Sequence, residues 1–486
     1  MEDLRSLKNT LEAHGQGHLL GFYDQLAPER KGALLKQLAA IDFDGLDSLI
    51  ARYVRGEPQA RLSGDIQPPE TVSARADDRR SASLLGKAVK RGNQLVAKGK
   101  IAALVVAGGQ GTRLGVESPK GCLEATPVAS KPLFQVFAEQ ILAVSKRAGP
   151  AIPWYVMTSE ANDVATRAYF RQHDFFGLGA DNVFFFLQGS MPAFGLDGKL
   201  LLADAGTVAC SPNGHGGSLP ALRDSGALDD MRKRGIELIS YFQVDNPLVR
   251  CVDPLFLGLH DMRGAEMSAK VLPKRDPTEK LGNVCVVDGK VTVIEYSDMP
   301  AELADECTKD GRLRFSAGSI AIHVLSRQFV EQLTAGGACQ LPYHRAEKIV
   351  PYVDHAGKVV RPVTPNAVKL EMFVFDALPL AKETVILETD RSEEFSPIKN
   401  AEGQDSPATS LHDQVRRAAK WLEGAGVVVP RDADGQVAAA IEISPLYADS
   451  AEELARKVDK DLKISAGQSV YLDSRGQTGG LRPSPA

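Results

Sequence analysis

The stretch IAALVVAGGQGTRLGVESPKG, residues 101–121, sets the interpretation of the whole chain. Its apolar run from Ile101 to Ala107 predicts a buried β-strand. Four glycines follow between positions 108 and 115, and because glycine has no Cβ, such a loop lets backbone N–H groups approach an anion closely. Arg113 within the loop and Lys120 just after it supply positive charge suited to phosphate oxygens. The stretch therefore predicts a strand and loop that bind phosphate.

Two well-known glycine motifs do not match this loop. A Walker A loop requires Gly-Lys-Ser/Thr after a four-residue gap, which is absent here. The dinucleotide fingerprint requires G-x-G-x-x-G, whereas Gly109, Gly111 and Gly115 are spaced one residue too widely. A dinucleotide-dependent oxidoreductase is therefore disfavoured, and a plain structural turn is disfavoured by the two cations. The spacing instead resembles the loop with which nucleotidyltransferases hold an NTP.

The composition is that of an ordinary globular protein. The chain has 486 residues, 43% of them hydrophobic and 24% charged, which predicts roughly two to four domains. Its net charge of -5 disfavours a nucleic-acid partner. None of the six cysteines forms a C-x-x-C pair, so no zinc site or disulfide framework is indicated, and reduced thiols fit the cytoplasm. No apolar run approaches the roughly 20 residues of a membrane span, and the first residues lack signal-peptide features, so we expect no membrane partner.

Three regions are predicted along the chain. Residues 1–98 form an N-terminal helical region, with Leu4, Leu7 and Leu11 at helical spacing and Pro28 suited to a first helical turn. This region includes an extended linker over 56–82 and a helix over 83–98. Residues 99–390 form the central domain. Residues 391–486 form a C-terminal domain with a helix over 410–424, a β-like piece over 437–443 and a tail, from about 474, expected to be disordered.

Apolar segments in the central domain predict a mixed sheet flanked by helices, and hence an α/β fold. The first four predicted strands are separated by roughly 25–55 residues, which favours crossover connections and parallel pairing. The later strands lie closer together and favour an antiparallel insertion, with a hairpin across Asp288-Gly289. The predicted strands are 101–107, 153–158, 183–187, 237–244, 267–272, 284–287, 291–296 and 317–324.

Polar residues follow several of these strands, where open α/β sheets place their ligands. An Asp after a strand is often a helix cap, but a phosphate site needs a counter-cation, which favours metal binding at Asp245. Taken alone, the glycines of loop 212–217 indicate only a turn, the lysines a solvated surface, and His215 a structural role. The polar candidates are Gln188, His215, Asp245, Asn246, Glu295, Tyr296, Lys369 and Lys399.

Across about 310 residues the chain resembles the eukaryotic-type UDP-sugar pyrophosphorylases, and within them those that act on UDP-N-acetylglucosamine. UDP-glucose pyrophosphorylases differ in the first motif, where they carry Leu at the position of Gln110. The motifs that carry the resemblance occur in order: VVAGGQGTRLG (105–115), SPKG (118–121), PLFQVFAEQI (132–141), FFLQGSMPA (185–193), PNGHGG (212–217), VDNPLVRCVDP (244–254), VVDGKVTVIEYSDM (286–299), KLEMFVFD (369–376) and EFSPIKNAEGQDSPATS (394–410).

The resemblance implies a Rossmann-like, GT-A-like nucleotidyltransferase domain over 99–390 followed by a small α+β domain. It implies that UTP and a hexose 1-phosphate, N-acetylglucosamine 1-phosphate by overall similarity, give a UDP-sugar and pyrophosphate. Magnesium is the implied cofactor, and a monomer or weak homo-oligomer is expected. The alternatives are glucose 1-phosphate as substrate, or a UDP-sugar sensor without catalysis.

The resemblance also assigns roles to individual residues. Arg113, Lys120 and Lys369 are the expected catalytic cations, and Asp245 is the expected Mg²⁺ ligand. Gln188 by its side chain and Gly214 by its backbone match the uracil-recognition positions. The remaining nucleotide positions are Val106, Ala107, Gly108, Gly109 and Gln243, and the expected sugar-binding residues are His215, Glu295, Tyr296 and Lys399.

Two departures from the family pattern concern the sugar. The family's Gly-Asn-Gly-Gly loop has His215 in place of Asn, and its Asn-Ala-Gly-Asn segment reads Ser316-Ala317-Gly318-Ser319. Both changes remove amide groups that could reach the sugar, and a site built around a hydrogen bond rejects substrates that leave it unpaired. The residues alone therefore leave the choice of sugar open.

Overall fold

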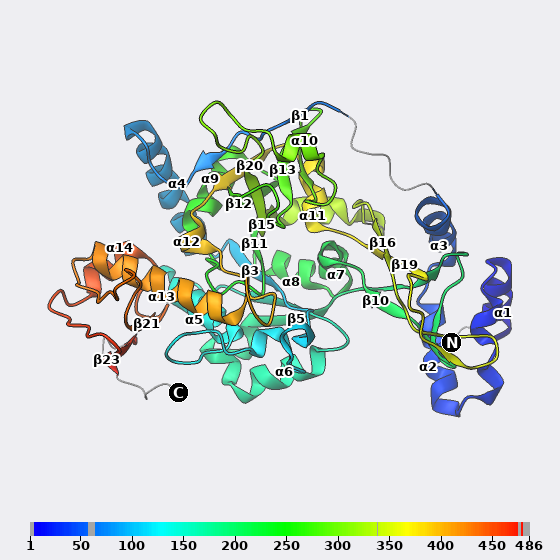
Figure 1. Cartoon of the computed structure of the whole chain (residues 1–486). Coiled ribbons are helices and arrows are strands. Elements are labelled where there is room, and N and C mark those ends of the chain that lie inside the picture. The colour runs from blue at the N-terminus through cyan, green and yellow to red at the C-terminus, as the bar shows by residue number, and fades with distance from the viewer. Residues whose placement is uncertain (1–3, 57–63, 338, 475–477, 480–486) are drawn as a thin grey trace. The chain divides into compact units, whose positions relative to one another are not determined.

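The computed structural model describes residues 4–56, 64–337, 339–474 and 478–479, which form two compact units (Figure 1). The sheet unit comprises Gly64–Leu187, Ala221–Ala338 and Ala377–Ala486. The N-terminal unit comprises Met1–Ser63, Gln188–Pro220 and Cys339–Asp376. Both are assembled from separated segments, whereas the boundaries expected after residues 98 and 390 divide the chain along its length. Those domain boundaries stay a prediction.

The sheet unit is built on one large mixed sheet, as the sequence predicts. Strands β11, β3, β4 and β5 are parallel neighbours, and β11 pairs antiparallel with β15. Two short strands within the predicted linker 56–82 extend the sheet, and the first of them, β1 (Ile66–Gln67), pairs with the β13–β14 hairpin. In order across the sheet the strands are β2 (Val72–Ser73), β20 (Thr384–Glu388), β12 (Met267–Pro273), β15 (Ala317–Ser326), β11 (Leu238–Gln243), β3 (Ile101–Val106), β4 (Trp154–Thr158) and β5 (Val183–Leu187).

Helices cover both faces of this sheet, which explains why β3 is continuously apolar. Ala103 and Val105 face the helices α4, α5 and α9, and Ala102 and Leu104 are buried on the opposite face. On that opposite side, the Tyr155 hydroxyl of β4 donates to Asp230 of α8. Before its C-terminal part, the α-helices of this unit are α4 (Arg79–Ala97), α5 (Leu133–Ala148), α6 (Asp163–Gln172), α8 (Ala227–Lys233), α9 (Pro254–Arg263), α10 (Ala301–Ala304), α11 (Arg327–Leu333) and α12 (Arg391–Glu394). Helix α7 (Ser218–Asp224) contains the sequence boundary between the units.

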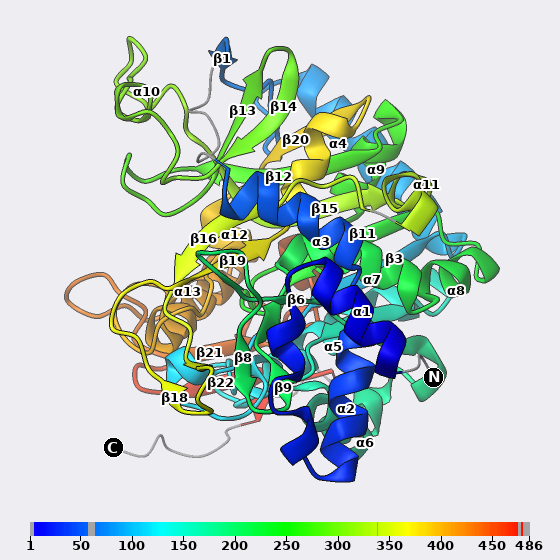
Figure 2. The ribbon, with the colours of Figure 1, turned by 90° about the vertical axis from the view of Figure 1, so that its right-hand side faces the viewer.

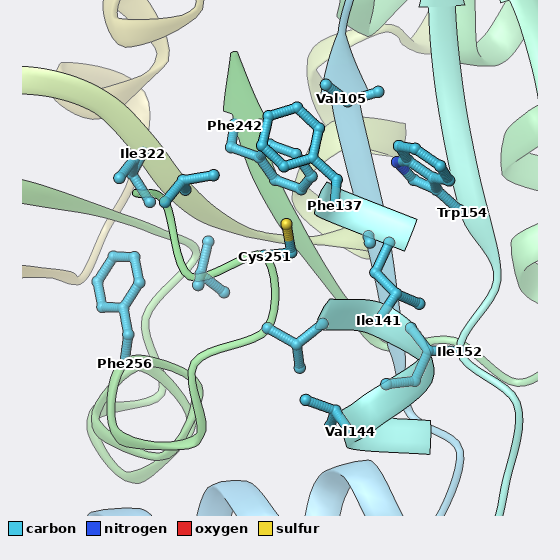
Figure 3. Close-up of a cluster of buried hydrophobic side chains, with 14 of the residues drawn as sticks. Val105, Phe137, Ile141, Val144, Ile152, Trp154, Phe242, Cys251, Phe256 and Ile322 are labelled. Atoms are coloured by element: carbon cyan, nitrogen blue, oxygen red, sulfur yellow. The ribbon is translucent and has the colours of Figure 1, made fainter. Parts of the chain in front are cut away.

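The main core lies between β3, β11 and α5 (Figure 3). Phe137 of α5 meets Phe242 of β11 edge-on, with 5.3 Å between ring centroids. Beside it, Cys251 is fully buried after β11, as Figure 3 shows. This packing fixes the carboxyl ends of β3 and β11 relative to each other.

Helix α4 begins four residues earlier than the sequence predicts. Asp78 accepts from the Ser81 backbone N–H and the Ser81 hydroxyl interacts with the Asp78 backbone, which forms a capping box that starts the helix at Arg79. Farther along, Gly92 allows α4 to cross α9 closely, because a Cβ there would lie 1.9 Å from the Pro254 carbonyl oxygen.

The antiparallel part of the sheet contains the predicted hairpin and an unpredicted bulge. Strands β13 (Asn283–Val287) and β14 (Lys290–Ile294) are joined by Asp288 and Gly289 with φ of 48° and 81°, which is typical of a type I′ turn. In β15, residues 320–322 lie opposite the single residue Lys270 of β12. Ala321 within this bulge has a φ of 55°.

The C-terminal part of the sheet unit contains α13 (Pro407–Gly424), α14 (Ala451–Lys457), β21 (Ala440–Ile443) and β22 (Ser469–Leu472). Trp421, Leu422 and Ile441 lie in its apolar core. The prediction of a disordered tail is wrong at β23 (Thr478–Gly479), which pairs with β22. Residues 475–477 and 480–486 lie outside the described residues.

The N-terminal unit contains the predicted amphipathic helices and several small sheets. Leucines on one face of the helices pack with Phe194, Val208 and Val368 from the later segments. Its elements are α1 (Leu4–Ala13), α2 (Pro28–Ala39), α3 (Phe43–Leu49), a π-helical turn (Ile50–Val54), β6 (Ser190–Pro192), β7 (Phe194–Gly195), β8 (Leu202–Asp204), β9 (Thr207–Val208), β10 (Cys210–Pro212), β16 (His344–Lys348), β17 (Tyr352–Val353), β18 (Val359–Val360) and β19 (Ala367–Glu371). Figure 2 shows α2 beside β9 of this unit. Across the described residues, no helix is long and apolar enough to cross a membrane.

Ala321 provides a test of backbone strain. Its left-handed conformation costs an L-residue about 1–2 kcal/mol, and glycine avoids this cost while losing about 0.5–1 kcal/mol in entropy. We expect Ala321→Gly to raise the free energy of unfolding by up to about 1 kcal/mol, measured by urea denaturation. Ala321→Val should lower it, because a β-branched side chain tolerates this conformation less well. A loss of stability in the glycine variant would contradict the strain at this position.

His260 of α9 makes stability depend on pH. Its Nδ1 is 2.8 Å from the Ser268 hydroxyl, and burial lowers its pKa to about 4. The neutral ring is favoured in the folded state, so its contribution is complete above pH 6.5 and is lost as the pH falls towards 4, amounting to about 3 kcal/mol at most. Chemical denaturation between pH 7 and 4 should show this slope, and His260→Gln should reduce it. The matched variant His412→Gln, at an exposed histidine, should keep the slope of the unaltered protein.

Candidate active site

The glycine loop begins where β3 ends, and its first carbonyl groups are held on one side. Asn162 donates to the Ala107 carbonyl oxygen at 2.9 Å, and the Ser159 hydroxyl donates to that of Gly108 at 2.8 Å. In a trans peptide the N–H points opposite to the C=O, so the N–H groups of Gly108 and Gly109 point away from the 159–162 turn. The loop therefore presents backbone donors of the kind that bind phosphate.

Four predicted site residues from three separate segments come together at this end of the sheet. The Lys120 Nζ lies 3.8 Å from the Asp245 Oδ2, and each side chain is only 14% exposed. Burial lowers the pKa of Lys120, the charges of Lys399 and Arg113 lower it further, and Asp245 acts in the opposite direction. The charges of Arg113 and Lys399 therefore lie near Lys120, which itself lies beside Asp245.

Strand pairing and a hydrogen bond to a later segment of the chain place Asp245 at this end of the sheet. It lies two residues beyond Gln243, the last residue of β11, which pairs with Val106 of β3. The Ile398 N–H donates to the Asp245 carbonyl oxygen at 2.8 Å. This bond joins the end of β11 to residues 394–399, which we call the strap and which carry Lys399.

Asn246, the residue after Asp245, makes two further bonds to the strap. Its Nδ2 donates to the Glu394 carbonyl oxygen at 2.7 Å, and its Oδ1 accepts from the Ser396 N–H at 3.1 Å. Asn246 is buried, and its Oδ1 also accepts from the Leu248 N–H at 3.2 Å. The two hydrogen bonds to the strap tie the segment that carries Asp245 to the one that carries Lys399.

A buried ion cluster under the strap was missed from the sequence. Lys270 of β12 is fully buried and donates to Asp253 at 2.6 Å and to the Glu394 carboxylate. The Thr389 hydroxyl donates to the second Glu394 oxygen at 2.8 Å. The available signal was a single lysine inside the otherwise apolar segment MSAKVLP, residues 267–273.

Glu295 and Tyr296 follow the hairpin strand β14. The Glu295 carbonyl oxygen accepts from the N–H groups of Asp298 and Met299, and Tyr296 is 47% exposed. Gly282 joins this hairpin to β15, because its carbonyl accepts from the Ser319 N–H at 2.8 Å. The two expected sugar residues therefore lie on the same part of the sheet as the altered Ser316–Ser319 segment.

The N-terminal unit contains the expected uracil residues. The Gln188 side chain donates to the Gly214 carbonyl oxygen at 2.7 Å. Gly214 has a φ of 83°, and a Cβ there would lie 2.3 Å from the Met372 carbonyl oxygen, so glycine is required. Lys369 lies on β19 of the same unit, and β19 leads directly to Met372.

His215 follows Gly214 and packs in an aromatic stack. Its ring lies 5.2 Å from that of Phe373, which also stacks on His344 at 4.4 Å. Its Nδ1 accepts from the Val374 N–H at 3.2 Å, which assigns the proton of the neutral ring to Nε2. Burial lowers the pKa of His215 to about 4 and His344 adds to this, so His215 is uncharged near pH 7. These contacts bind loop 212–217 to residues 372–374, and sugar binding by His215 stays a prediction.

No group of three or more His, Cys, Asp or Glu side chains that could hold a metal occurs among the residues described here. Asp245 is therefore a single carboxylate next to a phosphate-type loop. Mg²⁺ is commonly held by one or two carboxylates together with substrate phosphates and water, so this donor set fits a metal that arrives with a nucleotide.

These features define a nucleotidyltransferase-type sheet with a glycine loop and a cationic site at the strand ends. The UDPGP family, described as UTP--glucose-1-phosphate uridylyltransferase, matches residues 44–406, and the chain belongs to this family. Its fold is that of the UDP-sugar pyrophosphorylases.

Relatives of known name are similar over most of the chain. The "UDP-N-acetylhexosamine pyrophosphorylase-like protein 1" of Mus musculus is 38% identical over 510 residues, covering 99% of both chains. The "UDP-N-acetylglucosamine pyrophosphorylase" of Saccharomyces cerevisiae is 38% identical over 390 residues, covering 77% of this chain and 80% of the relative. The crystal structure of the uridine diphosphate N-acetylglucosamine pyrophosphorylase from Trypanosoma brucei, in complex with an inhibitor, has a TM-score of 0.78 and 27% identity, covering 94% and 95% of the two chains.

The buried cluster makes a stability prediction. Lys270→Met would leave Asp253 and Glu394 as buried carboxylates without their ammonium partner, so we expect the free energy of unfolding to fall by about 3–5 kcal/mol. Denaturant unfolding should be compared with Lys290→Met, which removes an exposed lysine from β14 and should change stability by less than about 0.5 kcal/mol. Equal effects of the two substitutions would contradict the role of the cluster.

Proposed function

We propose that this protein transfers the uridylyl group of UTP to a hexose 1-phosphate and releases pyrophosphate. The observation that carries the proposal is that Lys120, beside Asp245 and next to the glycine loop, has the charges of Arg113 and Lys399 close to it. Membership in the uridylyltransferase family supports it.

The reaction needs charge stabilisation more than proton transfer. An oxygen of the sugar phosphate, already an anion at neutral pH, attacks the α-phosphorus of UTP, and the bond from that phosphorus to the pyrophosphate oxygen breaks. Two anions must approach each other, so positioning and electrostatic stabilisation supply most of the rate enhancement. Arg113, Lys120 and Lys369 would bind the phosphates, with the N–H groups of Gly108 and Gly109.

The remaining residues would hold the two substrates in place. Gln188 and the Gly214 backbone would recognise uracil, and Val106, Ala107 and Gln243 would lie along the nucleoside. His215, Glu295, Tyr296 and Lys399 would contact the sugar phosphate. In this arrangement Lys399 reaches the reacting phosphate from the strap that Asn246 holds.

Asp245 would bind a divalent cation, which we propose is Mg²⁺. The single carboxylate fits a metal whose other ligands are phosphate oxygens and water. When bound, the metal would neutralise phosphate charge and favour departure of pyrophosphate. Lys120, 3.8 Å from Asp245, would orient the carboxylate in the absence of the metal.

N-acetylglucosamine 1-phosphate is the proposed sugar substrate, since similar proteins are named for UDP-N-acetylglucosamine and UDP-N-acetylhexosamine. Glucose 1-phosphate is the second candidate. The description of the family favours it, and so does the uncharged His215, which replaces an amide.

We further propose that the protein acts in the cytoplasm as a monomer or weak homo-oligomer, without nucleic acid or membrane. The spacing of the cysteines supports the cytoplasm, and the net charge of -5 supports the absence of a nucleic-acid partner.

The test is pyrophosphate release from UTP and Mg²⁺ with N-acetylglucosamine, N-acetylgalactosamine and glucose 1-phosphates in parallel. We expect the highest kcat/KM with N-acetylglucosamine 1-phosphate. Lys120→Met and Asp245→Asn should each lower kcat/KM by about 10²–10³-fold, because each removes charge that acts on the phosphates. Lys98→Met, at an exposed lysine, is the matched control and should change little.

The other outcomes separate the alternatives. A preference for glucose 1-phosphate would show that the changes at His215 and Ser319 have altered the sugar site. Binding of UTP without release of pyrophosphate from any sugar phosphate would contradict the enzyme and favour a sensor.

A further inference from the structure

A cavity of about 60 Å³ lies within the sheet unit, beneath the segment that follows Asp245. Its walls come from α5, from residues 247–250 and from α13 and β21 of the C-terminal part. About 10–15 Å³ of such volume holds one water molecule, so this cavity has room for a small polyatomic ligand. The side chains that matter for its chemistry are Arg250, Arg417, Gln140, Gln414, Trp421 and Glu442.

Two guanidinium groups in the cavity wall have unused hydrogen-bond donors. Arg417 uses Nη1 for the carbonyl oxygens of Leu248, at 3.3 Å, and Glu393, at 3.0 Å, and lies over the Trp421 ring at 5.2 Å. Arg250 makes no hydrogen bond, and no ion pair within 4.0 Å, to any residue in the described part of the chain. A guanidinium has five N–H donors in a planar fork, so most of those in this cavity are available.

The carboxylates of the wall are already engaged. Glu442 accepts from the backbone N–H groups of Val128 and Ala129 at 2.9 and 2.7 Å. Asp449, the other lining carboxylate, pairs with Arg147. Lys131, the third lining cation, pairs with Glu139 at 2.6 Å. The cavity thus has two available cations and no lining carboxylate that is free to neutralise them.

Burial and neighbouring charges affect the two guanidinium groups in opposite directions. Burial lowers the pKa of Arg417 to about 10, and the neighbouring charge of Arg250 adds to this, while Glu393 acts in the opposite direction. For Arg250, Glu394 and Asp253 outweigh burial and raise the pKa, so this arginine stays charged although both carboxylates bond to Lys270. A bound anion would relieve the repulsion between the two guanidinium groups.

We propose that this cavity is a second ligand site, which binds one phosphate-type oxyanion between Arg250 and Arg417. Guanidinium groups bind such anions in bidentate fashion through parallel N–H donors. Free phosphate and pyrophosphate share this chemistry. The bound anion would also tighten the Leu248 and Glu393 segments, which flank Asp245 and the strap.

Isothermal titration calorimetry of inorganic phosphate and of pyrophosphate into the full chain, without nucleotide, tests the proposal. Arg417→Gln and Arg250→Gln should each weaken binding at this site by about tenfold or more. The matched control Arg416→Gln changes the adjacent arginine of α13, whose side chain is 58% exposed, and should leave binding unchanged. Lys120→Met, which alters the glycine-loop site, should retain the second-site binding.

Binding that weakens in Arg250→Gln and Arg417→Gln but persists in Lys120→Met supports the proposal, and the anion that then binds more tightly identifies the source of the phosphate group. Binding of neither anion to the unaltered protein would overturn it. Binding retained in both Arg417→Gln and Arg250→Gln but lost in Lys120→Met would also overturn it, because the anion would then occupy only the glycine-loop site. Circular dichroism of each variant separates lost binding from lost folding, and Arg250→Gln provides a readout if Arg417→Gln does not fold.

Discussion

Repulsion among like charges is the constraint on which this structure depends. The charges of Arg113 and Lys399 lie near that of Lys120, which is 3.8 Å from Asp245, and the Lys120 and Asp245 side chains are largely removed from water. Burial and neighbouring cations both disfavour a charged lysine, as the lowered pKa of Lys120 records. Only a rigid surrounding framework can keep such an arrangement in the absence of phosphate.

Three sets of interactions hold the glycine loop, Asp245 and the strap in place. Parallel pairing of β3 and β11 brings the glycine loop and Asp245 to one edge of the sheet. Asn246 then joins that edge to the strap with two hydrogen bonds. Below them, Lys270 holds Glu394 by a buried ion pair, so the strap is fixed at its origin as well as beside Asp245. Each set limits the freedom of a charged group before substrate arrives, and such preorganisation is the main source of electrostatic catalysis.

Most of the sheet was predictable because its signals are local. The run from Ile101 to Val106 is buried on both faces and therefore continuously apolar, and Asp288-Gly289 specifies its turn by backbone conformation. The start of α4 was placed too late, because the capping box depends on Asp78 and Ser81 within a polar stretch that suggests a linker. Strand β20 was missed because it follows short turns and gains its place by pairing with β12, far away in the sequence.

Part of the site was also predictable, because some of its signals are local in the sequence. Glycines and cations on one loop are visible in the sequence, and the residues after strand ends can be expected to share an edge. The roles of Asn246 and Lys270 were not visible, because they depend on partners about 125–150 residues away. His215 is an intermediate case: the sequence marks it as unusual, and only the structure gives its stacking on Phe373 and its bond to Val374.

The discontinuous N-terminal unit has a consequence for protein synthesis. Its first segment ends at Ser63, but the core that covers the leucines of α1 and α2 includes Val368 and Leu370, which are translated more than 300 residues later. At about 5–20 residues per second, the ribosome takes roughly 15–60 s to supply them. During that interval the apolar faces of the first helices lack their final partners. The apolar faces of these helices are therefore completely covered only after β19, the strand that carries Lys369, has been translated.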